Sequence, residues 1–339
     1  EHLMFGGSEN ADDFDYYIQK SGGENNAFTN QDMTVYYEYL PCDNVEIALW
    51  LEADRMQGLC LNHENLSKER KVVLEEFKES CLNEPYGDIW HHLSPLSYTK
   101  HPYRVPTIGE VPEHIEQANL EDVQLFYHNF YCPNNAVLTV SGNVEANQIF
   151  ELAQKWFRDI PRGKAQKPTI LEEPQQLSRR QKTVQANVPL DALYMVFHNA
   201  ERKSDKYYID DIITDILAEG EASILYEQLV KEQELFSFVD AYITGSLDKG
   251  LVVIEGKLAE HVSFERAEAA FWMLLEQLSN QKIGQNELEK IQHRIEHNLE
   301  FSEMSNLQKA ISLGYYEILG NANLINQEKE KYLAITAAA

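Results

Sequence analysis

The chain has 339 residues, which is enough for two domains of about 150 residues each. Hydrophobic residues make up 43% of it and charged residues 25%, a globular composition, and no run approaches the roughly 18 apolar residues that a membrane-spanning helix needs. The formal net charge of −26 repels phosphate backbones and anionic lipids, which argues against nucleic-acid and membrane partners. Peptides and small molecules are the better partner classes.

The first half of the chain predicts helices and extended segments in alternation. The expected elements are a helical turn at 1–7, an extended run at 26–39, helices at 45–58 and 67–81, a loop at 82–112, a helix at 120–130, a β-rich run at 136–141 and a helix at 146–157. Proline, lysine and glutamine then accumulate at 161–185, which is typical of an interdomain linker.

The second half repeats this order of elements. The pattern predicts strands at 192–198, 236–243 and 251–258 and helices at 207–217, 224–232, 264–278, 286–301 and 307–319. We therefore expect an α+β protein of two homologous α/β repeats, each with a mixed sheet flanked by helices. The expected domains are 1–160 and 186–339, joined by the linker at 161–185.

Both ends of the chain resemble the interior of a longer protein. The sequence opens inside a helical turn that runs into Gly6-Gly7, and it finishes on Ala337-Ala338-Ala339 without a cap or a closing strand. We expect that each domain lacks an edge. The four cysteines, Cys42, Cys60, Cys81 and Cys132, form neither a CxxC metal motif nor a dense disulfide framework, and no motif marks one as a nucleophile.

Two carboxylates interrupt the apolar face of the predicted helix at 67–81. Glu69, Val72, Val73 and Glu76 follow the i, i+3, i+4, i+7 spacing that places side chains along one stripe of a helix. Both glutamates could lie at the rim of the buried face and point to water. Alternatively, they could ligate a metal or form a buried base, since a half-buried carboxylate needs a cation or hydrogen-bond donors.

Several segments together resemble the insulinase/pitrilysin family of metallopeptidases, the inverted zincins with the motif His-x-x-Glu-His. They are EHLMFGG at 1–7, SGGENNAFTN at 21–30, ERKVVLEE at 69–76, HPY at 101–103, IG at 108–109, YCPNN at 131–135 and VSGN at 140–143. A looser resemblance continues through residues 226–229 and LGYY at 313–316. The resemblance implies a metalloenzyme fold of the mitochondrial-processing-peptidase type.

By this resemblance, Glu1 matches the family's general base and His2 its second zinc histidine. Glu76, 74 residues after His2, matches the third ligand, and Glu69 matches an auxiliary acidic residue. The implied cofactor is one Zn²⁺ ion with an open position, and the implied reaction is hydrolysis of peptides or small unfolded proteins. The remaining ligand, a histidine three residues before Glu1, lies outside this sequence.

The resemblance also assigns a substrate-binding strand. Asn26, Ala27 and Phe28 match the edge strand that pairs with an extended peptide, with the Phe28 side chain shaping a pocket. An ordinary strand with a buried phenylalanine is the alternative.

Two positions at which this sequence departs from the family pattern imply a second homologous half. Family members grip the substrate carbonyl with an arginine and a tyrosine seven residues apart, but Val230 and Ser237 stand at those positions here. We expect a partner half from a homodimer, a heterodimer or a longer chain. The rival interpretation is a non-catalytic family member that serves as a structural or peptide-binding subunit. The resemblance favours a bacterial periplasmic location slightly over the cytoplasm.

The one complete His-x-x-Glu-His in the sequence, His293 to His297, is interpreted differently. The apolar stripe of its helix consists of Leu288, Ile291, Ile295 and Leu299, so the two histidines are expected on the solvent side. His91 and His92 are expected in a surface loop, and Tyr36 and Tyr37 in strand packing.

Overall fold

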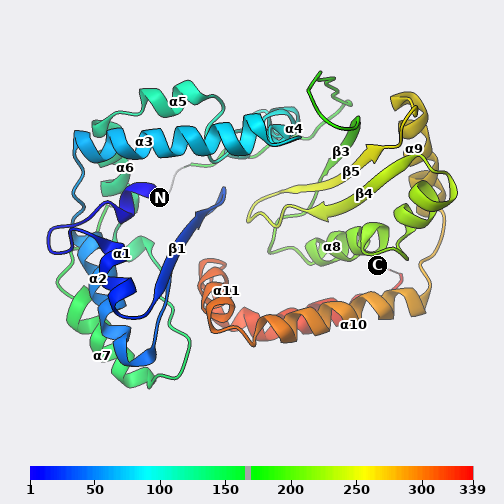
Figure 1. Ribbon diagram of the computed structural model, residues 1–339. Coiled ribbons are helices and arrows are strands. Elements are labelled where there is room, and N and C mark those ends of the chain that lie inside the picture. The colour runs from blue at the N-terminus through cyan, green and yellow to red at the C-terminus, as the bar shows by residue number, and fades with distance from the viewer. Residues whose placement is uncertain (165–168, 339) are drawn as a thin grey trace. The chain divides into compact units, whose positions relative to one another are not determined.

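A computed structural model describes residues 1–164 and 169–338, and it divides into two compact units (Figure 1). The first unit contains Glu1–Gln181 together with Ser305–Ile318, and the second contains Lys182–Met304 together with the chain from Leu319 onward. Each unit combines helices with a small sheet whose described strand pairs are all antiparallel. The α+β class predicted from the sequence is confirmed.

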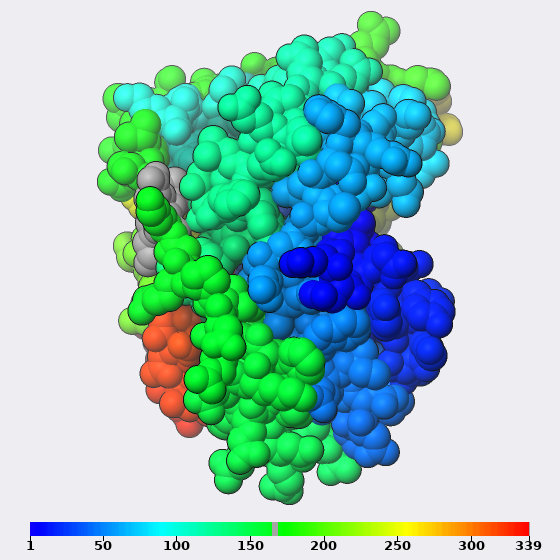
Figure 2. Space-filling view, turned by 90° about the vertical axis from the view of Figure 1, so that its left-hand side faces the viewer, coloured from blue at the N-terminus to red at the C-terminus, as the bar shows by residue number. Residues whose placement is uncertain are grey.

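The first unit is built mainly of helices around one β-hairpin. Its elements are η1 (His2–Phe5), α1 (Phe14–Lys20), β1 (Glu24–Thr29), β2 (Thr34–Tyr39), η2 (Cys42–Asn44), α2 (Val45–Gln57), α3 (His63–Phe77), η3 (Lys78–Asn83), α4 (Ile89–Ser97), η4 (Pro102–Arg104), α5 (Pro112–Gln117), α6 (Leu120–Phe130), η5 (Pro133–Asn135), α7 (Ala146–Phe157) and α11 (Asn306–Ile318). Figure 2 shows one face of this unit, where the orange surface of α11 lies beside a green part of the chain. A hydrogen bond from Thr139 Oγ1 to the Ala310 carbonyl joins the segment before α7 to α11 (2.9 Å).

Helix α3 starts one turn earlier than the apolar periodicity predicts because Asn62 caps it. The Asn62 side chain accepts a hydrogen bond from the Asn65 backbone N–H (2.9 Å), which satisfies one of the free donors of the first turn. After Phe77 the backbone continues as the π-helical turn η3, so the helical path covers the whole predicted span of 67–81. This long path carries both glutamates of the stripe.

The predicted loop at 82–112 is wrong in part, because it contains α4 and the short turn η4. Pro95 lies inside α4, and a proline in a helix interior removes a backbone donor, which is why the sequence pattern there favours a loop. The helix forms nevertheless, with Leu93, Ser94 and Ser97 buried. Burial of this face outweighs the local preference against a helix.

The predicted β-run at 136–141 is also wrong as a strand. Alternating apolar residues suit a strand, yet a strand forms only when its backbone pairs with a neighbour. Among the residues that the structure describes, no strand pairs with this segment. It therefore runs as an irregular segment, with Val137 and Leu138 exposed.

The second unit holds a three-stranded antiparallel sheet of order β3-β5-β4. Its elements are β3 (Ala192–His198), α8 (Asp205–Ala218), η6 (Tyr226–Glu232), β4 (Phe236–Ile243), β5 (Leu251–Leu258), α9 (Phe264–Ser279), α10 (Gln285–Ser302), η7 (Ala322–Gln327) and α12 (Glu328–Leu333). The central strand β5 is buried at Leu251, Val253, Ile254, Gly256 and Leu258, and Ile254 and Leu258 pack with η6 and α9 in one apolar cluster. Leu225, Leu229, Val253, Ala267 and Phe271 in this unit are inaccessible to solvent.

The predicted linker at 161–185 has no helix or strand in residues 161–164 and 169–185, and its residues 165–168 lie outside the described part of the chain. None of the helices within residues 1–164 and 169–338 has both the length and the apolar character that a bilayer crossing requires.

Candidate metal centre

His2 lies between two carboxylates of α3. Its Nδ1 atom is 3.6 Å from Glu69 Oε2, and its Nε2 atom is 3.2 Å from Glu76 Oε2. The side chain of Glu69 is 16% exposed, that of His2 34% and that of Glu76 54%. The structure thus brings together three of the residues that the sequence singles out.

The helical stripe explains why one histidine reaches both glutamates. Glu69 and Glu76 are seven residues apart, so they leave the same side of α3 two turns from each other. The turn η1, which carries His2, packs against this side of α3. Both carboxylates therefore face an imidazole, Glu69 from a half-buried position and Glu76 from an exposed one.

The spacing of the two nearest atoms fits a zinc ion. Two ligand atoms that share one tetrahedral zinc at about 2.0–2.2 Å are themselves about 3.3 Å apart, close to the 3.2 Å between His2 Nε2 and Glu76 Oε2. The contact of Nδ1 with Glu69 matches the outer carboxylate that commonly orients a metal-binding histidine. Within the described residues, no three histidine, cysteine, aspartate or glutamate side chains converge on one metal position. In the described part of the chain, His2 Nε2 and Glu76 Oε2 are the candidate ligand atoms that lie closest together at this site.

Glu1 stands next to His2 and faces the hairpin. Its Oε2 atom accepts a hydrogen bond from the hydroxyl of Thr29, the last residue of β1. The family resemblance places Thr29 in the same edge strand as Phe28 but gives its side chain no role of its own. Only the pairing of β1 with β2 shows that the Thr29 side chain reaches Glu1.

The β-hairpin presents the backbone of Ala27 at an open edge. Asn30 N–H donates to the Met33 carbonyl (3.0 Å), so residues 30 and 33 form a hydrogen-bonded pair that closes the turn. Since such pairs alternate with non-hydrogen-bonded ones along an antiparallel ladder, Ala27, opposite Tyr36, directs its N–H and C=O away from β2. The Asn26 side chain accepts from that N–H (2.8 Å). Among the described residues, β1 has β2 as its only strand partner.

The predicted site residues of β1 differ in exposure. Asn26 and Phe28 are exposed, Phe28 by 38%, whereas Ala27 is half-buried. Phe28 is therefore not the buried phenylalanine of an ordinary strand, which was the alternative that the sequence left open.

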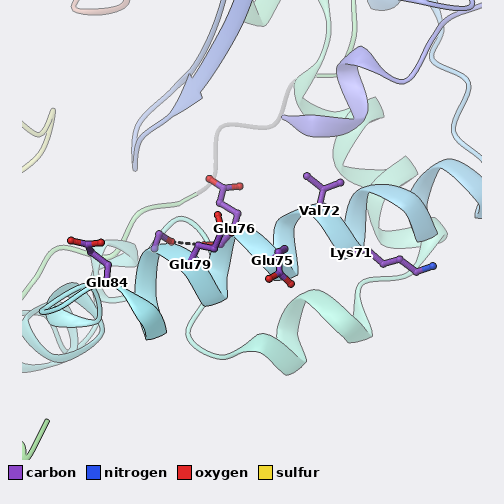
Figure 3. Close-up of a pocket in the computed structure, with 7 residues that line it drawn as sticks. Lys71, Val72, Glu75, Glu76, Glu79 and Glu84 are labelled. Atoms are coloured by element: carbon purple, nitrogen blue, oxygen red, sulfur yellow. Dashed lines mark hydrogen bonds between the residues drawn. The ribbon is translucent and has the colours of Figure 1, made fainter. Parts of the chain in front are cut away.

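An acidic groove adjoins Glu76 on the solvent side of α3. It has a volume of about 870 Å³ and is lined by Lys71, Val72, Glu75, Glu76, Glu79, Ser80 and Glu84. Figure 3 shows Glu75 and Glu76 leaving the helix in different directions, so these neighbouring carboxylates do not share one position. Glu75 pairs instead with Lys78 (3.1 Å).

A buried cation supports the turn that carries His2. The Arg55 guanidinium, 1% exposed, lies over the rings of Phe5, Phe14 and Tyr36 at 5.4, 4.4 and 4.5 Å from their centres. It pairs with Glu52 and with Glu38. Burial raises the pKa of Glu38 well above its usual range. Burial also acts to raise the pKa of Glu52, but Arg55 and Glu38 hold it below its ordinary value.

The chain matches two family profiles. Residues 1–103 match the profile described as insulinase (peptidase family M16), and residues 117–295, more than half of the chain, match the profile described as peptidase M16 inactive domain. The chain belongs to peptidase family M16. All the residues placed around His2 fall in the insulinase match of this M16 chain.

Named relatives and solved structures agree with this family. Zinc protease PqqE of Helicobacter pylori is 29% identical over 315 residues, which cover 91% of this chain and 70% of PqqE. The crystal structure of a protease from Helicobacter pylori matches with a TM-score of 0.93 at 26% identity, over all of this chain and 83% of that one. The periplasmic protease PqqL from Escherichia coli shares the fold, with a TM-score of 0.73 at 14% identity, over all of this chain but 40% of PqqL.

The complete His-x-x-Glu-His of this M16 chain faces solvent, as predicted. His293 and His297 are exposed on α10, whereas Leu288, Ile291 and Ile295 are buried. Glu296 between them pairs with Lys329 of α12.

The prediction that His91 and His92 lie in a surface loop is wrong, because both are half-buried on α4. His91 Nε2 bonds to the Gly109 carbonyl (2.9 Å), and His92 Nε2 bonds to Asp88 (2.9 Å). Their roles are those of packing residues. The predicted strand packing of Tyr36 is observed, with its hydroxyl 2.6 Å from that of Tyr131.

Proposed function

We propose that this M16 chain is the zinc-binding half of an endopeptidase that hydrolyses peptides or small unfolded proteins. The observation that carries the proposal is the position of His2 between Glu69 and Glu76, with Glu1 beside it. The name of the relative PqqE, a zinc protease, supports the same activity.

We assign one proposed role to each residue of the candidate metal centre. His2 Nε2 and Glu76 Oε2 would hold one zinc ion, and Glu69 would keep the imidazole oriented through Nδ1. The remaining protein ligand would be a histidine three residues before Glu1, a position outside this sequence. When bound, zinc supplies the Lewis acidity that activates water and polarises a peptide carbonyl.

Glu1 is the proposed general base. Its carboxylate takes the proton of the attacking water and then delivers it to the leaving amine of the cleaved peptide, so that one group serves as base and acid in turn. Its exposed position, next to the proposed ligand His2, suits contact with both water and substrate.

The edge of β1 is the proposed substrate-binding surface. An extended peptide would pair with the outward N–H and C=O of Ala27, and its carbonyl would replace the Asn26 side-chain oxygen on the Ala27 N–H. Because backbone pairing carries little side-chain information, the sequence preference would rest on neighbouring groups such as the exposed Phe28 ring.

Replacement of the general base tests the proposal. In the natural full-length polypeptide, Glu1→Gln is expected to keep the zinc content and to lower the rate of peptide hydrolysis about 100-fold to 10,000-fold. The control is Glu9→Gln, which changes an exposed carboxylate soon after η1 and should leave the rate unchanged. Equal rates for wild type and Glu1→Gln, or a wild type without zinc and activity, would contradict the proposal and favour a non-catalytic subunit.

A further inference from the structure

Thr29 connects two parts of the site that the proposed function uses separately. It ends β1, the proposed substrate strand, and its hydroxyl donates a hydrogen bond to Oε2 of Glu1, the proposed general base. The two residues are 28 positions apart in sequence. Only the fold brings them together.

The hairpin register holds the Thr29 hydroxyl in this direction. Thr29 stands opposite Thr34 at the end of the ladder, one position before the hydrogen-bonded pair of Asn30 and Met33. This makes Thr29 and Thr34 a non-hydrogen-bonded pair, the type in which opposite side chains lie closest. Their hydroxyl oxygens are 3.1 Å apart.

The proton count of the two hydroxyls sets the direction of the bonds. A hydroxyl has one proton to donate and two lone pairs that accept. Since Thr29 gives its proton to the Glu1 carboxylate, which accepts only, the Thr29 oxygen can only accept from Thr34, whose hydroxyl is also hydrogen-bonded to Tyr131. The contact with Thr34 is therefore compatible with a Thr29 proton directed to Glu1.

We propose that Thr29 is a positioning residue that aims the Glu1 carboxylate, an inference that rests on the proposed function. It holds one carboxylate oxygen, Oε2, and leaves Oε1 to take the proton of the attacking water. An exposed glutamate side chain with three rotatable bonds gains alignment from such a restraint, because loss of alignment by about 1 Å can cost about 100-fold in rate.

A purely structural role would have different consequences. If Thr29 served only to pair β1 with β2, its removal would loosen the substrate edge and raise KM. A residue that aims the base lowers kcat and leaves KM and zinc content unchanged, because neither the backbone of β1 nor the ligand atoms of His2 and Glu76 are altered.

The test replaces the hydroxyl while it keeps the side-chain shape. In the natural full-length polypeptide, Thr29→Val is expected to lower kcat by about 10-fold to 100-fold, with KM and bound zinc unchanged. Thr29→Ser restores the hydroxyl and should recover most of the rate. The control is Thr107→Val, which changes an exposed threonine between η4 and α5 and should have no effect.

Three results would overturn the inference. These are an unchanged kcat in Thr29→Val, a loss expressed in KM alone, or a Thr29→Ser variant as slow as Thr29→Val. If the wild type is active and Glu1→Gln is not, these results reject the role of Thr29 and leave the proposed function intact. A wild type without peptidase activity rejects both.

Discussion

Both ring nitrogens of His2 face a carboxylate, and this defines how its side chain is used. Glu69, which is largely shielded from solvent, faces Nδ1, while the more exposed Glu76 faces Nε2. In the proposed metal centre, the carboxylate behind the imidazole orients it, and the other ring nitrogen binds the metal. The two glutamates of one helical stripe therefore have different expected roles.

Substitutions of three α3 glutamates should separate these roles. Glu69→Gln is expected to weaken zinc binding about 10-fold to 100-fold. This is the usual effect of removing a residue that does not touch the metal but orients a metal-binding side chain. Glu76→Gln should weaken it further, since a direct ligand is lost. Glu75→Gln, next to Glu76 but paired with Lys78, should leave zinc affinity unchanged. The measurement is competitive titration with a chelator, and equal affinities for Glu75→Gln and Glu76→Gln would contradict the assignment.

The residues around His2 differ in how far the sequence could predict them. Glu69 and Glu76 follow a helical period, so their common stripe is visible in the sequence, and the family resemblance supplies His2 and Glu1. Thr29 is quoted in the same resemblance without a role. Its contact with Glu1 depends on the turn that pairs Asn30 with Met33, and strand periodicity alone does not give that register.

Among the elements, the predicted linker contacts the segment after α4 through the side chain of Glu173. The Glu173 carboxylate accepts hydrogen bonds from the backbone N–H groups of Thr99, Lys100 and His101, at 2.8–3.0 Å, and from the Thr99 hydroxyl at 2.7 Å. Successive N–H groups that converge in this way form an anion-binding nest. We call this contact the Glu173 clamp.

The Glu173 clamp predicts a pH-dependent contribution to stability. Burial acts to raise the pKa of the Glu173 carboxyl, but the donors of Lys100, His101 and Thr99 lower it from 4.5 to about 2. A carboxyl with a lowered pKa stabilises the fold fully above its unfolded value, and the effect is lost as pH falls toward the folded value. Glu173→Gln should therefore be less stable than wild type at pH 7, and the difference should shrink between pH 4.5 and pH 2.

Urea denaturation across this pH range measures the difference between wild type and Glu173→Gln. The control is Glu151→Gln, which removes an exposed carboxylate on α7 and should show little difference at any pH. A Glu173→Gln variant as stable as wild type at pH 7 would show that the clamp contributes nothing.

At the scale of elements, the sequence predicts best where local and tertiary preferences agree. The bounds predicted for the helix at 120–130 and the three strands of the second unit are those observed. The sequence pattern predicts a loop where α4 forms, because Pro95 disfavours a helix locally while burial of Leu93 in the fold favours it. The run at 136–141 has strand periodicity but no strand partner among the described residues. Pairing is a property of the whole fold, which a local pattern does not contain.

For the whole molecule, we propose that the chain supplies one half of a working enzyme, because the substrate grip that the family resemblance implies is missing. Val230 and Ser237 stand where the resemblance expects an arginine and a tyrosine, and Val230 packs against the apolar cluster of the second unit. We therefore expect that a second homologous half completes the substrate site.

The oligomeric state of the active species tests this expectation. The natural full-length polypeptide should cleave peptides only as a dimer, as a complex with a homologous subunit, or as a chain that contains both halves. Activity measured together with mass by analytical ultracentrifugation would show this. Robust cleavage by a monomer that holds one M16 half would contradict it.

The central claim is that hydrolysis depends on zinc held by His2 and Glu76. The most direct measurement is the rate of peptide cleavage by the natural full-length polypeptide after zinc is removed with a chelator and then added back. Cleavage should stop on removal and return on addition in the wild type, but it should not return in Glu76→Gln at the same free zinc. Cleavage that continues without zinc, or that returns equally in Glu76→Gln, would contradict it.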